Sequence, residues 1–599
     1  MPTTSHCIPE EPNAPKSAVP SLSYSSSSDE PDEPQPPRPR RASTVLISQN
    51  AADVQRLIGE PGTKLIEKCC GGGCCMAITN NDKLTFERVP LPDNDAYRAL
   101  QLNVGLIPTS LSGIPELPPK TISLLPIKND TPSEPTTDSA VPVASNTDSI
   151  DFTPRAATEN HEVDTKIHPP NFVQPHPPYN VYSARIFSAR ELTKPGAEKR
   201  TYHFDLDVTD YPEELGVDFK VGGAIGVSAP NEASTVDELL DLLLVPRFQR
   251  DRKVLLKTES GRWPTVWGDE QARELITTRR DLLTWCSDIQ SYPPTKPLLR
   301  LLAEYATNPD EKKILLYLCS GEGQGVFCDF RTGPHVTINQ LLHAFPSSKP
   351  PLDHLLSQLQ TLMPRFYSLS NDPHESCVPA AGCSRLIEIA VTVHETPNWR
   401  GGPRTGVGSG FFERQAQAFI AAEAAGQKVD LRIPMFKGLM ANPLAREFVS
   451  DGPMLLIGAG VGVAPFRGFV QRRLKNANCA NKVWVLQGVR DSLLDELYSG
   501  EWGVHESEVK KVVQSRGGRG GGGKKYVQDE VRAQADLVWR IINSLDGRVF
   551  VCGSSKGMGE GVESALVEVA MKKGNLSKDE ATEFWGLKKE AGQYIAETW

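Results

Sequence analysis

The C-terminal third of this chain alternates short apolar runs with segments of helical character. Apolar runs lie at 454–457, 483–486 and 549–551, and helical patterns follow them. Strands that alternate with helices are typical of a doubly wound parallel sheet, because each crossover must pass over one face of the sheet. We therefore predict an α/β domain over residues 449–599.

A glycine turn joins the first apolar run to its helix. The segment Leu455-Leu-Ile-Gly-Ala-Gly-Val-Gly-Val-Ala-Pro-Phe-Arg-Gly-Phe469 has the pattern of a strand, a turn and a helix start. Glycines let a backbone approach a pyrophosphate, and a proline in the first helical turn loses no hydrogen bond. The glycine spacing differs from the usual dinucleotide fingerprint, so the loop alone also fits an ordinary strand-to-helix turn.

Composition limits the class of protein. The 599 residues allow about three or four units, and a hydrophobic content of 39% is enough for large cores. A net charge of −9 argues against nucleic acid as the main partner. No apolar run reaches the ~20 residues of a membrane span, and the N-terminus does not have the pattern of a signal peptide. The 12 scattered cysteines do not suggest a disulfide scaffold, so we expect a cytoplasmic protein.

The first part of the chain is poor in apolar residues. Residues 1–43 are rich in Pro and Ser, and residues 106–178 are rich in Pro, Ser, Thr and Asp, so we expect a disordered region and a disordered linker. Residues 44–105 carry more apolar side chains, but too few to predict an independent core.

Strand patterns frame the middle of the chain. Residues 200–208 alternate apolar and polar side chains, as a half-buried strand does. Residues 219–229 are Gly-rich and β-prone, and another strand pattern covers 386–393. Residues 236–355 follow a helical period without a strong strand pattern. We therefore predict that residues 179–448 form a β-barrel-like domain that helices interrupt.

Two motifs in this region bring together groups that can carry chemistry. Arg365-Phe-Tyr-Ser368 contains a cation, an aromatic ring and a hydroxyl. On a strand, Arg365 and Tyr367 point to one face and Ser368 to the other. Gly406-Val-Gly-Ser-Gly410 offers backbone N–H groups at a helix start, which suits an anion. Each motif alone also fits a structural turn.

A further set of polar residues lies in the C-terminal third. Ser515, Arg516, Lys524, Tyr526 and Gln528 provide groups that suit an adenosine 2′-phosphate and favour NADPH over NADH. The Gly-rich segment between Arg516 and Lys524 also matches the Arg-Gly-Gly repeats of RNA-binding proteins. Two such repeats in an acidic chain are weak support for that alternative, and the segment fits a solvated loop equally well.

Together these motifs resemble the FAD/NADPH half of the NADPH–cytochrome P450 reductase family, which is ferredoxin–NADP reductase-like and includes the sulfite reductase flavoprotein and methionine synthase reductase. The resemblance runs from about residue 180 to the terminus, with the motifs in the family's order. It implies an α+β multidomain protein with an antiparallel FAD-binding β-barrel, a helical connecting insert and a doubly wound NADP-binding domain. It also implies an NADPH-dependent FAD oxidoreductase.

The resemblance assigns cofactor contacts residue by residue. Arg365 would neutralise the FAD pyrophosphate, Tyr367 would stack on one isoalloxazine face, and Ser368 would lie near flavin N5. The residues that would hold the FAD pyrophosphate from the other side are Gly406, Val407 and Ser409. The residues that would contact NADPH are Gly458, Gly460, Gly462, Ala464, Ser515, Arg516, Lys524, Tyr526 and Gln528.

The catalytic set that the resemblance implies is Ser368, Cys552, Glu597 and Trp599. Cys552 would approach nicotinamide C4, although a buried free cysteine is more commonly a small apolar residue. Trp599 would cover the other flavin face and move aside for nicotinamide. Glu597 stands where the family often has a shorter acidic residue, and Ser554 where it commonly has Asp. Direct transfer from nicotinamide to flavin needs no nucleophile, so Ser368 and Cys552 would position and polarise the reacting atoms.

The diflavin members of the family begin with an FMN domain, and this sequence has no phosphate loop of that kind ahead of residue 180. We therefore expect no FMN, and a separate acceptor such as a flavodoxin-like, haem or iron–sulfur protein. The alternative is a FAD-containing regulatory or scaffold protein with vestigial catalysis, which the complete nicotinamide-facing set argues against.

A cysteine cluster leaves several chemistries open. Cys69, Cys70, Cys74 and Cys75 flank three glycines. Four thiolates suit zinc or Cu(I), but this spacing is tighter than zinc sites usually have, and we assign no metal ligand. S-acylation would give peripheral membrane contact, and redox exchange with the flavin is a third option. A reduced loop without a function is the remaining alternative.

Overall fold

The computed structural model describes residues 85–127, 166–173, 180–212, 219–265, 270–333, 335–374, 377, 382–438, 444–445, 452–474, 482–503, 506–516 and 525–598. The predictions for residues 1–43, for the cysteine cluster, for Lys524 and for Trp599 lie outside the described residues.

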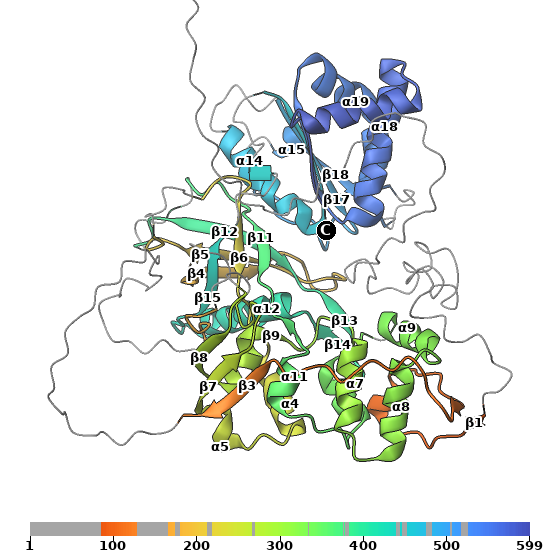
Figure 1. The fold of residues 1–599 in the computed structure, drawn as a ribbon. Coiled ribbons are helices and arrows are strands. Elements are labelled where there is room, and N and C mark those ends of the chain that lie inside the picture. The colour runs from red at the N-terminus through yellow and green to blue at the C-terminus, as the bar shows by residue number, and fades with distance from the viewer. Residues whose placement is uncertain are drawn as a thin grey trace, which may run out of the picture.

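The C-terminal domain is a five-stranded parallel sheet (Figure 1). Its strand order is β18 (Lys510–Gln514), β17 (Val483–Val489), β16 (Met454–Ala459), β19 (Arg548–Gly553) and β20 (Tyr594–Thr598). The first five residues of β16 are buried, which explains its continuous apolar run: helices cover both faces of the sheet. The predicted parallel sheet is confirmed.

Helices lie on the two faces of this sheet because alternate side chains of β16 point to opposite sides. Leu455 and Ile457 share one core with the helices that follow β18 and β19, and Leu456 shares another with the helix after the glycine turn. The helices of the domain are α14 (Ala464–Leu474), α15 (Glu506–Val509), α16 (Val527–Ala533), α17 (Ala535–Trp539), α18 (Glu560–Gly574) and α19 (Lys578–Glu590), with a 3-10 turn at Gly460–Val463 and π-helical turns at Arg540–Ser544 and Ser555–Gly559.

The end of the described chain is a strand. β20 pairs in parallel with β19, with Cys552 opposite Glu597 and Gly553 opposite Thr598. Tyr594 and Ile595 are buried, so apolar packing holds this strand at the edge of the sheet. The residues just before Trp599 are therefore fixed in the fold.

The middle domain is a six-stranded antiparallel sheet with the order β11 (Arg365–Ser368), β6 (Ala224–Val227), β15 (Arg432–Lys437), β4 (Tyr182–Glu191), β5 (Thr201–Asp207) and β12 (Leu386–Thr392). The predicted strands at 200–208, 219–229 and 386–393 are β5, β6 and β12. An isolated bridge joins Leu369, just after β11, to Ile389 of β12, so the two outer strands meet. Helix α12 (Val407–Ala424) packs on this sheet, with the rings of Phe204 and Phe412 4.9 Å apart.

The insert after β6 is mainly helical, as predicted, but it also contains strands. β7 (Lys253–Thr258) and β8 (Arg273–Thr278) pair with each other, and β9 (Ser287–Asp288) pairs with β10 (Gln360–Thr361). β7, β8 and β9 lie in a stretch whose sequence shows no strong strand pattern. The helices of the insert are α4 (Ala233–Leu242), α5 (Arg247–Arg250), α6 (Arg279–Asp281), α7 (Lys296–Glu304), α8 (Pro309–Cys319), α9 (Gln324–Thr332), α10 (Ile338–Ala344) and α11 (Leu352–Leu356), with a π-helical turn at Leu282–Cys286. After the insert, β13 (Glu395–Pro397) and β14 (Pro403–Thr405) form a hairpin ahead of α12.

Part of the predicted linker belongs to this insert. β3 (Ile122–Pro126) pairs with β7 and completes a three-stranded sheet with β8. β1 (Phe86–Glu87) and β2 (Ile107–Pro108) form a short antiparallel pair on either side of α3 (Asp95–Arg98). Ile107, Ile122 and Tyr97 of α3 lie in the same core as the insert helices. The prediction of disorder over 106–178 is therefore wrong for the stretch that ends at β3, because the distant β7 supplies its hydrogen-bond partners.

None of the helices in the described part of the chain has the length and apolar character needed to cross a membrane.

Candidate active site

Three of the residues predicted to be catalytic lie together. Ser368 is at the end of β11, while Cys552 and Glu597 are register partners on β19 and β20. The Ser368 hydroxyl donates a hydrogen bond to Glu597 Oε1 over 3.3 Å. A residue of the antiparallel sheet therefore contacts a residue of the parallel sheet, and the group lies where the two domains meet.

Burial shifts the pKa values of two side chains in this group, Cys552 and Glu597. Burial raises the pKa of the Cys552 thiol well above its ordinary value, and the charge of Glu597 raises it further. Burial also raises the pKa of the Glu597 carboxyl, and the hydrogen bond from Ser368 partly opposes this. Glu597 Oε2 is buried and has no hydrogen-bond partner among the described residues. Because such an oxygen is costly to leave unpaired, it marks a place for a ligand's polar group.

The other side of the group is formed by β11 and the start of α12. A Cβ atom on Gly408 would lie 2.7 Å from Tyr367 Oη and 3.3 Å from Arg365 Cγ, so only glycine fits there. The Tyr367 ring packs edge-on against Phe412, with ring centroids 4.9 Å apart, and burial raises the pKa of its phenol. The β11 motif is thus pressed against the first turn of α12, where unpaired N–H groups attract anions. This arrangement fits a flavin cofactor with a pyrophosphate.

Sequence reasoning missed Gly408, although it lies inside the glycine motif that was singled out. Of the residues that were predicted there, Gly406 caps α12 and Val407 is buried. The Ser409 hydroxyl accepts a hydrogen bond from the His394 backbone N–H over 3.0 Å, which leaves its proton for a ligand. Arg365 Nη2 lies 3.4 Å from both Asp288 Oδ2 and Ser291 Oγ, so its guanidinium is already oriented.

The glycine loop after β16 lies beside Cys552. A Cβ atom on Gly462 would come within 2.2 Å of the Cys552 carbonyl oxygen, so a side chain would push the loop off β19. Gly458, near the end of β16, packs closely on Val463, and Gly460 has a positive φ of 55°. Ala464 begins α14. The loop is therefore at the carboxyl edge of the sheet, where open α/β sheets bind ligands.

The residues predicted to contact the 2′-phosphate lie on neighbouring loops. Ser515 and Arg516 directly follow β18, Tyr526 precedes α16 with 48% of its surface exposed, and Gln528 is in the first turn of α16. The backbone N–H of Lys525 donates to the Gln514 carbonyl over 3.3 Å, which keeps the two loops side by side. The structure brings the described members of this set together.

A carboxylate that was not predicted as a site residue lies beside the residues predicted to contact the 2′-phosphate. Glu530 on α16 is buried and receives Lys511 Nζ and Lys525 Nζ, each at 2.5 Å, and Gln534 Nε2 at 2.6 Å. Burial alone would raise the pKa of Glu530, but these hydrogen bonds outweigh it and lower the pKa from 4.5 to about 2. Its two lysine partners lie on β18 and just before α16, in the segments that carry the residues predicted to contact the 2′-phosphate.

Replacing Glu530 with Gln is expected to destabilise this part of the domain by about 2 kcal/mol, because two charge-assisted hydrogen bonds are lost. Since folding lowers this pKa, the wild-type advantage is present above pH 4.5, the ordinary value, and shrinks as the pH falls towards 2. Hydrogen exchange of the β18 and α16 amides measures the effect. Glu583→Gln, on the exposed surface of α19, is the matched control; equal protection in the two variants would contradict the prediction.

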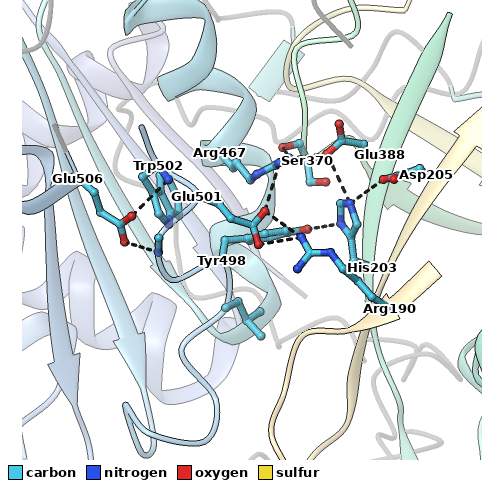
Figure 2. A network of polar contacts seen from close by, with 12 residues as sticks. Arg190, His203, Asp205, Ser370, Glu388, Arg467, Tyr498, Glu501, Trp502 and Glu506 are labelled. Carbon is cyan, nitrogen blue, oxygen red and sulfur yellow. Dashed lines mark hydrogen bonds and ion pairs between the residues drawn. The ribbon is translucent and has the colours of Figure 1, made fainter. Parts of the chain in front are cut away.

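A network of polar contacts joins the two domains (Figure 2). Arg467 of α14 pairs with Glu388 of β12, and its guanidinium lies over the Tyr498 ring at 4.9 Å. The Tyr498 hydroxyl is 2.9 Å from His203 Nδ1 of β5. Arg190 of β4 reaches Glu501 of the C-terminal domain with two contacts of 2.8 Å. These contacts join α14 and the segment after β17 to β4, β5 and β12 of the middle domain.

Comparison with known proteins adds the family. A family model described as an FAD binding domain matches residues 174–411, and one described as an oxidoreductase NAD-binding domain matches residues 456–564. An uncharacterized FAD-binding protein of Schizosaccharomyces pombe is 44% identical over 550 residues, which cover 86% of this chain and 89% of that protein. A second such protein from the same yeast is 44% identical over 504 residues, with 82% and 81% covered.

A more distant relative extends the comparison. The methionine synthase reductase of Bos taurus is 28% identical over 437 residues, which cover 70% of this chain. The match spans only 61% of the length of that protein.

Proposed function

Because this chain belongs to the NADPH–cytochrome P450 reductase family, in which it carries the FAD-binding and NADP-binding domains, we propose that it passes electrons from NADPH to a separate acceptor protein. It is an NADPH-dependent FAD-containing oxidoreductase, since both cofactor-binding domains match. FAD, when bound, supplies the redox chemistry by accepting electrons from NADPH and passing them on.

The observation that carries the proposal is the contact of Ser368 with Glu597 beside Cys552. Three residues from distant parts of the chain come together at the carboxyl edge of the parallel sheet. In our proposal the Ser368 hydroxyl orients the carboxylate, and the buried Glu597 carboxylate faces the nicotinamide ring as it becomes positively charged. Cys552 supplies a small, uncharged wall that fixes the distance of that ring. Trp599, one residue beyond β20, is proposed to cover the flavin ring.

For FAD, we propose that residues 179–448 form the cofactor-binding barrel. Arg365 and the first turn of α12, with Gly406, Val407 and Ser409, would hold the pyrophosphate. Tyr367 would stack on the flavin.

For NADPH, we propose that residues 449–599 form the binding domain. The glycine loop with Gly458, Gly460, Gly462 and Ala464 would lie against the NADPH pyrophosphate. The residues that would read the 2′-phosphate and adenine are Ser515, Arg516, Lys524, Tyr526 and Gln528.

The acceptor is proposed to be a flavodoxin-like, haem or iron–sulfur protein. Support comes from the relatives, because a methionine synthase reductase and a cytochrome P450 reductase are each named for a protein that receives electrons. A cytoplasmic location is likewise proposed, and cell fractionation tests it.

Anaerobic mixing with NADPH tests the oxidoreductase. The protein loaded with FAD is expected to lose its visible flavin absorbance on addition of NADPH, and more slowly on addition of NADH. The reduced protein is then offered candidate acceptors one at a time, and a true acceptor is reduced faster than free cytochrome or dye. A flavin that stays oxidised with NADPH would contradict the proposal.

A further inference from the structure

A glutamate of the middle domain lies on the loops that we assign to the 2′-phosphate. Glu198 is in the turn between β4 and β5, and its two carboxylate oxygens contact two arginines of the C-terminal domain. Arg490 Nη1 is 2.8 Å from Glu198 Oε1, and the Arg516 guanidinium pairs with Oε2. One carboxylate thus bridges both cations.

The two arginines form one local cationic site. Arg490 directly follows β17 and Arg516 comes just after β18, the neighbouring parallel strand. The Arg516 N–H donates to the Arg490 carbonyl over 3.1 Å, which keeps the two residues side by side. They lie at the carboxyl ends of the strands, where ligands bind in sheets of this kind. An anion that reaches Arg516 therefore also meets Arg490.

The turn that carries Glu198 is fixed on the C-terminal domain. The Lys194 N–H donates to the Leu494 carbonyl over 2.8 Å, and the Ala197 N–H closes the turn onto the Lys194 carbonyl over 3.0 Å. On the preceding strand, Arg190 holds Glu501 of the same domain, as Figure 2 shows. These contacts therefore position the Glu198 carboxylate beside Arg490 and Arg516.

We propose that Glu198 is an internal competitor for the 2′-phosphate of NADPH: its carboxylate occupies Arg516 and Arg490 and must leave when the phosphate binds. This rests on the proposed function, in which Arg516 reads that phosphate. A phosphate brings more negative charge and one more acceptor oxygen than a carboxylate, so it forms the stronger pair with the arginines. The two anions cannot share the arginines without repelling each other.

Exposure makes the exchange easy. The side chains of Glu198, Arg490 and Arg516 are 46%, 36% and 61% exposed. Exposed ion pairs are weak, so a bound phosphate displaces the carboxylate at a small cost, and the carboxylate returns when the product leaves. The consequence is that Glu198 weakens the binding of a 2′-phosphorylated nucleotide and leaves the binding of NADH unaffected. The turn thus sets how strongly the enzyme discriminates between the two.

Glu198→Gln tests the proposal, because it keeps the shape and removes the charge. The dissociation constant of adenosine 2′,5′-bisphosphate, measured by calorimetry on the FAD-loaded protein, is expected to fall about fivefold. The KM for NADPH should fall with it, and the KM for NADH should not change. The matched control is Glu568→Gln, which breaks a two-pronged surface pair with Arg532 in the same domain and should leave the dissociation constant as it is.

Two outcomes overturn the proposal. Weaker binding in Glu198→Gln would show that the carboxylate supports Arg516 instead of competing with the phosphate. Unchanged binding would show that it does neither. Arg516→Ala separates these failures from a failure of the proposed function. If Arg516→Ala weakens the binding of the bisphosphate while Glu198→Gln does not change it, only the competition is wrong; if neither variant changes it, the assignment of the 2′-phosphate site is wrong as well.

Discussion

Glu597→Gln is expected to slow the reduction of bound flavin by NADPH about 100-fold, the size of loss found when one preorganised electrostatic group is removed from an active site. As NADPH gives up its electrons, its nicotinamide ring gains a positive charge. The Glu597 carboxylate lies in a buried site, and its Oε2 has no hydrogen-bond partner among the described residues, so its charge is poorly screened there. Gln keeps the shape and can still accept the Ser368 hydrogen bond. Stopped-flow absorbance under anaerobic conditions measures the rate.

Two further variants make this result specific. Glu597→Asp keeps the charge on a shorter side chain and is expected to fall between Gln and wild type. Glu590→Gln removes an exposed charge at the end of α19 and should not alter the rate. A Glu597→Gln variant as fast as wild type would contradict the proposed role of the carboxylate.

The pH dependence of Glu597 has opposite signs for rate and for stability. Because folding raises its pKa, the rate is expected to fall on the acid side as the carboxylate becomes protonated below that raised value. The Gln variant should lack this acid limb. Protonation favours the folded state, so the stability gain exists at low pH and is lost as the pH rises through the folded pKa. Glu597→Gln should therefore be no less stable than wild type at pH 7, and a slow variant cannot be explained by unfolding.

The sequence allowed the central strands of the parallel sheet to be predicted because they are buried on both faces. β16 and β19 are continuous apolar runs, and such runs can be recognised from the local sequence without knowledge of their partner strands. The edge strands β18 and β20 were missed. β18 reads Lys-Lys-Val-Val-Gln and β20 reads Tyr-Ile-Ala-Glu-Thr, which are ordinary half-polar segments. They are strands because a neighbour of the sheet pairs with them, and a local pattern does not encode that neighbour.

The first part of the predicted linker was mispredicted for the same reason. β3 has the sequence Ile-Ser-Leu-Leu-Pro in a stretch rich in Pro and Ser. Its partner β7 begins at Lys253, far along the chain, so composition pointed to disorder while tertiary pairing produced a strand.

The residues of the candidate site could be predicted, but their arrangement in space could not. Ser368, Cys552 and Glu597 could be named through a family resemblance, but their contact depends on how two domains pack. Glu198 gave no signal at all, because the arginines that it contacts lie about half the chain away and a lone surface glutamate is unremarkable. Contacts between domains are the information that the one-dimensional pattern lacks.

Arg467→Met is expected to destabilise the junction between the two domains by about 3 kcal/mol, which is the usual cost of leaving one member of a buried ion pair without its partner. The side chains of Arg467 and Glu388 are 11% and 10% exposed, and Arg467 also donates to the Ser370 carbonyl over 3.3 Å. Burial opposes the charge of Arg467, but Glu388, Tyr498 and Glu501 raise its pKa overall. Met fills the space of the aliphatic stem but leaves the Glu388 carboxylate buried without this cation.

A matched pair of variants separates the loss of charge balance from the loss of packing. In the double variant Arg467→Met/Glu388→Gln, the carboxylate that faced Arg467 is removed as well, so much of the stability should return. Arg532→Met breaks an exposed pair with Glu568 and should cost less than about 1 kcal/mol. Since the chain has more than one domain, local hydrogen exchange across β12 and α14 is a better measure than a single unfolding midpoint. If Arg467→Met lowers the stability no more than Arg532→Met does, the junction is held by its apolar contacts, and the Ser368–Glu597 contact should survive without the ion pairs. If Arg467→Met lowers the stability more, flavin reduction should also slow in that variant. The reason is that Glu597 reaches Ser368 only while the two domains stay docked.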